Sequence, residues 1–286
     1  MQAQQHLGVD SKAQRNHLAW DTIKRSPGIV SEHIDEGATE ASTFYPDQMP
    51  SLELSTPPYP DQEPSIVEII NTDSFRAARN LLASDADAQG KTTVLNLASD
   101  IIPAGPWLRD LTKTQEEALC YSSTLYITLK RDYYPWPNLG PGSIAGIYSP
   151  GVVIFRDDLD HKCLELPQEE RRIVSVITVA APRCPDLTSD WKDFAKASDL
   201  EDLRGKIKLV YRMAAHNGQR YMVLGAMGCG AYWCPPHAVA REMKAILLEP
   251  EFKGWFRKVV FAVYSSPGNG EKNHNIFSEI FENVKV

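Results

Sequence analysis

The sequence predicts an α/β fold in which a sheet is flanked by helices on both faces, and three observations support it. From residue 66 onward, strand-like and helix-like segments alternate along the chain. Residues 173–179 are apolar on both faces, as expected of a strand that is covered on two sides. Two loops rich in glycine or proline, at 103–106 and 225–231, each separate a predicted strand from a predicted helix.

The first 64 residues are expected to form a helical and irregular N-terminal extension, packed on a domain that spans residues 65–286. Asp10 or Ser11 can cap a helix that runs to about Lys24, because short polar side chains accept hydrogen bonds from the first free backbone N–H groups. Residues 27–64 are predicted to be irregular. Prolines recur through this segment and disfavour both a regular helix and a central strand.

Apolar periodicity and turn residues define the elements of the second domain in order. Strands are predicted at 66–70, 92–98, 152–155, 173–179, 221–224 and 259–264. Helices are predicted at 73–83, with Asp73 as the cap, and at 115–129, 200–217, from about 235, and at 275–283. Residues 132–150 carry aromatic side chains and four prolines, and we expect them to form a loop.

Composition excludes several classes of protein. The formal net charge of -7 and the pI near 5.5 argue against generic binding to duplex DNA, which needs a basic face. No apolar run approaches the ~18 residues of a membrane span. Five cysteines, an odd number, fit a reducing compartment better than a disulfide framework, and the first six residues lack the pattern of a signal peptide. We therefore expect an intracellular protein, cytoplasmic or nuclear or both.

The most informative segment is Gln115-Glu116-Glu117, which follows the irregular loop at 103–106 and opens a predicted helix. Free N–H groups and the helix dipole make such a helix start a favourable place for an anionic or sugar-phosphate ligand. A carboxylate pair in such a cleft suggests glycosidic or acyl chemistry. The alternative is that the two acidic residues only stabilise the helix dipole.

The loop at 224–232, Leu-Gly-Ala-Met-Gly-Cys-Gly-Ala-Tyr, is the second informative segment. Glycines let the backbone approach a ligand closely, and several N–H groups can then surround a diphosphate. A tight turn between strand and helix needs glycine for structural reasons alone, so the loop by itself is weak evidence. No Lys-Ser/Thr pair follows it, which excludes a P-loop.

Taken together, these segments resemble the microbial-type poly(ADP-ribose) glycohydrolases, which have a macrodomain fold. The family's first motif, a strand ending in Asn-Phe-Ala-Ser, a Pro-Gly-Gly-Gly loop and Gln-Glu-Glu, corresponds to residues 96–99, 103–106 and 115–117. Its second motif corresponds to residues 224–232. The resemblance runs from about Arg15 to the C-terminal end. It implies a mixed sheet in a macrodomain-like catalytic domain at 65–286.

The resemblance also implies a reaction and roles for individual residues. The target would be the ribose–ribose O-glycosidic bond of poly(ADP-ribose), which is cleaved through an oxocarbenium-like state. Glu117 would protonate the leaving ribose hydroxyl and then activate water, while Glu116 would bind the ribose hydroxyls. The adenine would lie near Tyr133 or after Tyr264. The implied substrate-binding residues are Asn96, Ser99, Gly105, Gln115, Gly225, Ala226, Gly228, Cys229, Gly230, Ala231 and Tyr232.

One departure from the family pattern bears on activity. The family's triple glycine is replaced by Ala104-Gly105-Pro106, and Ile102 stands where the family usually has Asn. Pro106 has no N–H to offer a ligand, and Ala104 resists left-handed backbone geometry. The loop therefore favours a rival hypothesis, a macrodomain that binds ADP-ribose without turnover. A third possibility is a hydrolase of mono-ADP-ribosyl groups.

No cofactor and no metal are expected for this chemistry. Cys229, Cys234 and His237, with Cys184 as a fourth ligand, suggest zinc, but their spacing is not a usual zinc pattern. Cys229 as a nucleophile lacks an identifiable basic partner. The expected partners are poly(ADP-ribose) or ADP-ribose and ADP-ribosylated macromolecules, and the protein is expected to be a monomer that does not bind membranes.

Overall fold

The computed structural model describes residues 9–53, 57, 63–266 and 270–286. Its centre is a seven-stranded sheet in the order β1-β4-β5-β3-β6-β7-β2. β4 is antiparallel to both β1 and β5, and the other neighbouring pairs are parallel. The strands are β1 (Thr43–Tyr45), β2 (Glu68–Ile70), β3 (Thr92–Leu97), β4 (Gly146–Ile154), β5 (Arg172–Val179), β6 (Tyr221–Leu224) and β7 (Lys258–Ala262). The predicted α/β class with a mixed sheet is confirmed.

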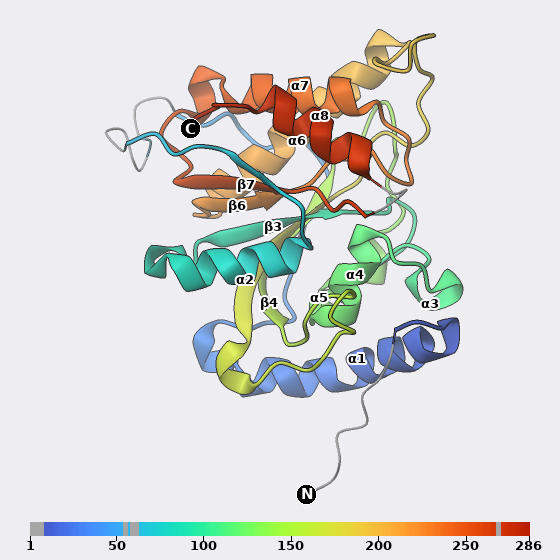
Figure 1. Ribbon diagram of the computed structural model, residues 1–286, viewed down its shortest axis with the longest axis vertical. Helices are drawn as coiled ribbons and strands as arrows, with labels where there is room; N and C mark the ends of the chain where they lie inside the picture. Colours follow the sequence, from blue (N-terminus) through green and yellow to red (C-terminus); the bar gives the residue numbers. More distant parts are fainter. Residues whose placement is uncertain (1–8, 54–56, 58–62, 267–269) are drawn as a thin grey trace, which may run out of the picture.

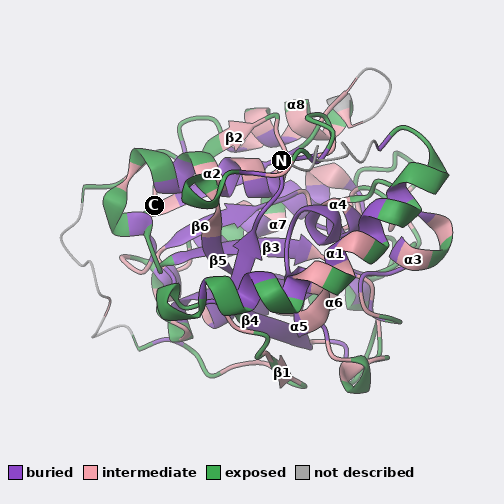
Figure 2. Ribbon diagram, turned by 90° about the horizontal axis from the view of Figure 1, so that it is seen from below, coloured by how far each residue is buried: buried purple, intermediate pink, exposed green. Residues whose placement is uncertain are grey.

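Helices cover both faces of the sheet (Figure 1). On one face lie α6 (Ala197–His216), α7 (Pro236–Leu247) and α8 (Glu271–Ile280); the other carries α1 (Lys12–Glu32), α2 (Ser74–Ser84), α3 (Trp107–Asp110), α4 (Gln115–Ser122) and α5 (Leu125–Thr128). Short 3₁₀ turns occur at Ile34–Glu36, Ala86–Ala88, Arg131–Tyr133, Gln168–Glu170 and Pro250–Phe252. Two large apolar clusters result, one on each face, and the central strands are buried (Figure 2).

The N-terminal helix is longer than the sequence predicts. Ser11 caps it in a capping box with Gln14, but the helix continues through Pro27 to Glu32 instead of ending near Lys24. Proline inside a helix costs ~3 kcal/mol because a backbone hydrogen bond is lost. Beyond the proline, Ile29 and Val30 are buried among β4 and β5 side chains, and each such burial contributes about 1.5–3 kcal/mol. Packing therefore outweighs the proline.

The segment expected to be irregular also contributes an edge strand. β1 pairs with β4 in the register Thr43↔Tyr148, so part of the N-terminal extension lies in the same sheet as the rest of the chain. Three residues are too few for periodicity to reveal a strand. Residues 1–6, where no signal peptide is expected, and Pro58 and Pro60 of the proline-rich segment lie outside the residues that the structure describes.

Two further expectations about boundaries are wrong. The single helix predicted at 115–129 is two helices, α4 and α5, with Ser123 extended between them at φ -148° and ψ 178°. The hydroxyls of Ser122 and Ser123 bond to carbonyls of the preceding turn, which competes with helix continuation. β4 begins at Gly146, inside the predicted loop, and accommodates Pro150 at a register shift between Ser149 and Val152.

The strands and helices at the ligand-binding motifs are where the sequence places them. β3 ends at Leu97 and β6 at Leu224, one residue before the glycine-rich loop. Asp73 caps α2 by accepting hydrogen bonds from Phe75 and Arg76 N–H. Within the described part of the chain, no helix is both long and apolar enough to cross a membrane.

Candidate active site

A cavity of about 1000 Å³ lies at the carboxyl ends of the parallel strands, where ligands bind in open α/β sheets. Its walls come from the segments that follow β2, β3, β5, β6 and β7 and from the first turn of α4. The volume is at the upper end of the range for small-molecule sites. Eight of the predicted substrate-binding residues line it together with Glu116: Ser99, Gly105, Gln115, Ala226, Gly228, Gly230, Ala231 and Tyr232.

Glu116 presents its carboxyl group to this cavity while its oxygens are fixed from below. Oε1 accepts a hydrogen bond from Asn96 Nδ2 at 3.1 Å, and Oε2 accepts one from Ser99 N–H at 2.8 Å. Burial is the main influence on this group and raises its pKa to about 8, against the opposing effect of those two donors. Glu116 is therefore mostly protonated at neutral pH.

Glu117 is oriented differently. It occupies the third position of α4, where Thr114 N–H donates to its carboxylate at 3.2 Å in a capping box, and the Thr112 hydroxyl donates to the same oxygen. The side chain has no solvent exposure and does not line the cavity. Its other oxygen, Oε1, is buried without a hydrogen-bond partner. Burial raises the pKa of Glu117 as well, although the two threonines oppose the effect.

Gln115 and Asn96 support this arrangement from the floor of the site. Gln115 Oε1 accepts from Leu97 N–H at 2.9 Å, while its amide donates to Leu95 O at 2.8 Å, so it completes the end of β3. Asn96 is fully buried and does not line the cavity; its amide donates to Glu116 and to Thr178 Oγ1. Asn96 thus lies behind the cavity wall, whereas Gln115 lines the cavity, and both orient groups at the end of β3.

The Ala104-Gly105-Pro106 loop closes over Glu116. Ala104 and Gly105 have φ values of 57° and 53°, so the alanine takes the left-handed conformation that it resists. A Cβ added to Gly105 would lie 3.3 Å from Glu116 Oε2. Pro106 lines the cavity and begins the short helix α3, which the sequence did not reveal.

The glycine-rich loop forms the opposite wall, but two of its predicted residues lie behind that wall. Gly225 packs under the loop, since an added Cβ would be 3.2 Å from Leu97 Cδ1, and Cys229 also does not line the cavity. Burial raises the pKa of the Cys229 thiol well above its usual range, which disfavours a thiolate nucleophile. Gly228 has a φ of 74°, and a side chain there would meet Ala181 and Cys234 at 2.6 Å.

Among the described residues, one group of potential metal ligands is closely spaced: Asp157, Asp158 and His161. Arg76 pairs with both aspartates, at 3.3 and 3.1 Å, and so supplies the positive charge there. The cysteines and histidine that suggested zinc from the sequence do not form such a group in the described part of the chain.

Several cavity residues carry no sequence signal that singled them out. One end of the cavity is acidic, with Asp73, Asp158 and Asp160; burial raises the pKa of Asp73 to about 6. Tyr264, one of the two expected neighbours of the adenine, lines the cavity near these aspartates. Its hydroxyl donates a hydrogen bond to Asp160 at 3.0 Å. Tyr133 does not line the cavity and stacks on Phe44 at 5.5 Å, so its ring packs the long loop.

The cavity also has three basic lining residues, Arg109, Lys113 and Arg183. Arg183 is anchored by a 3.0 Å ion pair with Asp100, a buried residue that also accepts hydrogen bonds from Tyr232 and Asn138. The network joins residues 100, 138, 183 and 232, which are far apart in the sequence and meet only in the folded chain. No local sequence motif therefore predicts it.

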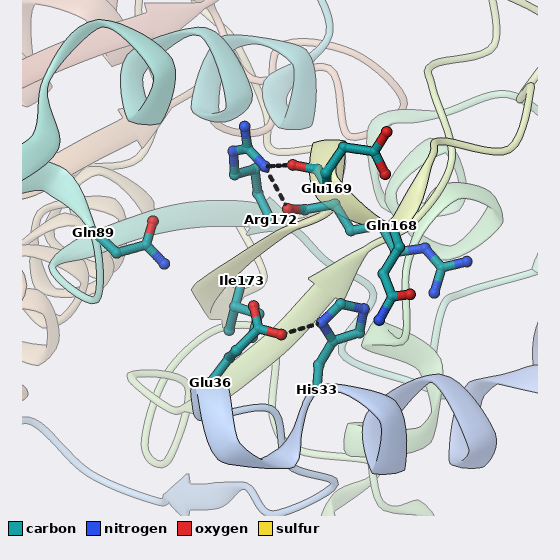
Figure 3. Close-up of a pocket in the computed structure, with 8 residues that line it drawn as sticks. His33, Glu36, Gln89, Gln168, Glu169, Arg172 and Ile173 are labelled. Carbon is teal, nitrogen blue, oxygen red and sulfur yellow. Dashed lines mark hydrogen bonds and ion pairs between the residues drawn. The ribbon is translucent and has the colours of Figure 1, made fainter.

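A second cavity, of about 500 Å³, lies near the start of β5, at the end of the sheet away from Glu116 (Figure 3). His33 Nδ1 lies 2.8 Å from Glu36 Oε1 there, and Arg172 donates to the carbonyls of Glu169 and Arg171. None of the site residues expected from the sequence lies in this second cavity.

Fold and site together define a macrodomain-like protein with a carboxylate-bearing cleft. Within that class, residues 29–157 match the family model described as the microbial-type PARG catalytic domain. The resemblance to the microbial-type poly(ADP-ribose) glycohydrolases, inferred from the motifs, is thereby confirmed.

Solved structures agree with this assignment. Poly(ADP-ribose) glycohydrolase from Thermomonospora curvata is 28% identical, with a TM-score of 0.72, over 94% of this chain and 99% of that one. The same enzyme bound to the inhibitor ADP-HPD is 27% identical, with a TM-score of 0.71, over 93% and 99%. The Deinococcus radiodurans glycohydrolase in complex with ADP-ribose is 27% identical, with a TM-score of 0.60, over 95% and 92%. Among curated proteins, no relative matches.

Proposed function

We propose that this protein is a poly(ADP-ribose) glycohydrolase that hydrolyses ribose–ribose O-glycosidic bonds and releases ADP-ribose. The family match and the solved relatives imply a glycoside hydrolase of this kind. The observation that carries the proposal is the Glu116–Glu117 pair at the base of the cleft, where one carboxyl faces the ligand space and the other lies directly behind it.

The two carboxyl groups suit different tasks. Glu116 is fixed by Asn96 and Ser99 and can use its remaining positions to bind ribose hydroxyls. Glu117 has a raised pKa and one oxygen without a partner, so it can carry a proton to the leaving oxygen and later activate water. To reach the bond, its carboxyl group must leave the contacts with Thr112 and Thr114. Hydrogen bonds to catalytic groups commonly form fully only with substrate bound.

The remaining predicted contacts extend this proposal to the rest of the substrate. The diphosphate would lie along the glycine-rich loop, with Ala226, Gly228, Gly230 and Ala231 at its wall. Its adenosine would point to the acidic end of the cavity. Binding of an ADP-ribose unit as such is supported by the Deinococcus enzyme, whose structure is a complex with ADP-ribose. We further propose that the active protein is a monomer, that it acts inside the cell, and that residues 1–64 serve as an extension on the catalytic domain.

A second candidate is a macrodomain that binds ADP-ribose without hydrolysing it. The orientation of Glu117 specifically favours this candidate, because a carboxyl group that stays in its capping box cannot protonate a ligand in the cavity. The left-handed alanine and the missing N–H of Pro106 point the same way.

Release of ADP-ribose from purified poly(ADP-ribose), without added metal, distinguishes the two candidates. We expect release by the wild type and none by Glu117→Gln, with ADP-ribose binding intact in both by calorimetry. Binding without release by the wild type would make the protein a reader of ADP-ribose. Release only from a target that carries a single ADP-ribosyl group would instead indicate a mono-ADP-ribosyl hydrolase.

A further inference from the structure

Trp233, which follows the glycine-rich loop, holds a large aromatic ring in solvent. Its side chain is 65% exposed, and its backbone is left-handed, with φ 57°. No aromatic ring of the described residues stacks on the Trp233 ring. The backbone N–H of Trp233 donates to Gly230 O at 3.0 Å. A bulky residue in this conformation is strained by about 1–3 kcal/mol, and such strain concentrates at binding sites.

The neighbouring side chains are held rigidly beside it. Tyr232 donates to Asp100 Oδ1 at 3.0 Å, and Arg183 donates to Asp100 Oδ2 at 3.0 Å. Cys184 N–H bonds to Tyr232 O at 2.8 Å, which joins the two chain segments. The Arg183 guanidinium lies 5.9 Å from the centre of the Tyr232 ring. The buried carboxylate of Asp100 therefore sets the positions of both Arg183 and the residue that precedes Trp233.

This group lies at the Glu116 end of the cavity. Asp100 directly follows Ser99, whose N–H holds Glu116 at 2.8 Å. Arg183 is tied to this end through its ion pair with Asp100, and it lines the cavity. Because the Arg183 side chain is 42% exposed, its guanidinium can meet a phosphate outside the bound ADP-ribose at this end.

The chemistry of the ribose–ribose bond indicates which part of the polymer lies at the Glu116 end of the cavity. When the ribose–ribose bond is cleaved, the leaving oxygen belongs to the adenosine ribose of the adjacent unit, so that unit's adenine and diphosphate start next to the scissile bond. We propose that Trp233 stacks on this adenine and that Arg183 meets a phosphate of the same unit, forming a subsite for the leaving side of the polymer. The inference rests on the proposed function, because free ADP-ribose has no second unit.

Exposed tryptophan alone would not support this subsite. Trp20 on α1 is 57% exposed and does not line the cavity, so it provides a control for surface aromatic residues. Trp233 differs because it directly follows Tyr232, which lines the cavity and shares the carboxylate of Asp100 with Arg183. Stacking of one base on an aromatic side chain gives affinity changes of about tenfold.

Binding measured by calorimetry in the Glu117→Gln background tests the proposal without turnover. We expect a dimer of ADP-ribose units to bind about tenfold more tightly than ADP-ribose. Trp233→Asn should abolish most of this difference and leave ADP-ribose affinity within about twofold, since asparagine tolerates left-handed geometry. Trp233→Phe should retain the preference for the dimer. Trp20→Ala should leave the affinities for both ligands unchanged. Arg183→Met should also weaken the dimer selectively.

Three results would overturn the subsite: equal affinity for dimer and monomer, an equal loss of both in Trp233→Asn, or equal competition by a single-stranded oligonucleotide of the same length. The last would assign the ring to nucleic acid. Because Glu117→Gln could perturb the site, the KM for polymer in Trp233→Asn with Glu117 intact gives a second reading, expected to rise about tenfold. If the wild type releases no ADP-ribose but keeps a Trp233-dependent preference for the dimer, the proposed hydrolysis fails and the subsite stands.

Discussion

The two sides of the first turn of α4 place adjacent carboxyl groups in opposite settings. On the cleft side, Glu116 contacts the end of β3 and faces a cavity of about 1000 Å³. On the buried side, Glu117 accepts hydrogen bonds from Thr112 and Thr114, which come just before α4. Consecutive helical residues point about 100° apart, so a Glu-Glu pair cannot send both side chains to one place without adjustment.

This difference shows that two adjacent residues of one sequence motif can face different environments, so that only one of them lines the cavity. Both groups have raised pKa values because both are buried, but only one is in reach of a ligand. Whether Glu117 changes its contacts on binding decides between a hydrolase and a reader. Four substitutions test the contrast between the two sides.

Glu117→Gln should have the largest effect. Loss of a general acid and base typically costs 10²–10⁴-fold in rate, so we expect kcat for ADP-ribose release to fall by about 10³-fold. The Kd for ADP-ribose should stay within about twofold, because Glu117 does not line the cavity. Single-turnover release and calorimetry measure the two quantities. A wild-type rate in this variant would transfer the acid role to Glu116.

Glu116→Gln should change how stability depends on pH. In the unfolded chain this carboxyl group titrates near pH 4.3, whereas burial raises its pKa to about 8 in the folded protein. Between these values the folded state holds the extra proton, so the contribution of Glu116 to stability is greatest at low pH and falls by on the order of 1.4 kcal/mol per pH unit as pH rises.

Urea unfolding of wild type and Glu116→Gln at pH 5 and pH 8 measures this slope. The variant removes the titration, so the difference in free energy of unfolding, variant minus wild type, should be several kcal/mol larger at pH 8. Any constant cost of placing an amide beside Asn96 cancels in this comparison. The same difference at both pH values would show that Glu116 is ionised in the folded protein.

Thr112→Val should loosen the buried side. The substitution removes the hydroxyl that donates to Glu117 and nearly preserves shape, so the free energy of unfolding should fall by about 1 kcal/mol. If Glu117 must leave this contact to act, kcat should rise several-fold. Polymer hydrolysis and urea unfolding give the two readings. Thr92→Val is the matched control, because the buried Thr92 hydroxyl donates to Ala88 O and Thr92 does not line the cavity. A lower kcat in Thr112→Val would mean that the hydroxyl assists catalysis in place.

Gly105→Ala, the last of the four, should lower stability by about 1–2 kcal/mol, because an alanine there must adopt a φ of 53°. The added methyl would also lie 3.3 Å from Glu116 Oε2, so ADP-ribose affinity should fall. Gly230→Ala, on the opposite wall, is the control, since nothing lies within 4 Å of its added Cβ. Equal effects on stability and affinity at the two positions would show that the loop over Glu116 is not tightly packed.

The sequence predicts the sheet well where strands are long and apolar. Residues 221–224 were expected as a strand and form β6, and the segment at 173–179 lies within β5. β1 and α3 were missed because three or four residues carry too little periodicity. The extension of α1 past Pro27 was missed because it depends on burial against β4 and β5, which local sequence does not contain.

For the site, the sequence predicts which loops meet but not how individual side chains turn. Ser99, Gln115, Glu116 and most of the glycine-rich loop reach the cavity as expected. Asn96, Gly225 and Cys229 lie behind its wall, because strand and turn geometry decides which side of the backbone faces the ligand. Their proposed roles, like that of Glu117, remain predictions. The Asp100 network was beyond reach, since its members are far apart in sequence.

The buried guanidinium of Arg15 connects the far end of the chain to the turn that holds Glu117. On α1, Arg15 donates to Leu111 O at 2.7 Å, and Leu111 immediately precedes Thr112. The region that matches the family model starts at residue 29, well after this arginine. A shortened protein trimmed to the matched boundary would therefore lose the support of the turn that holds Glu117. Any fragment made for crystallisation or assay should begin before α1, at or upstream of Val9.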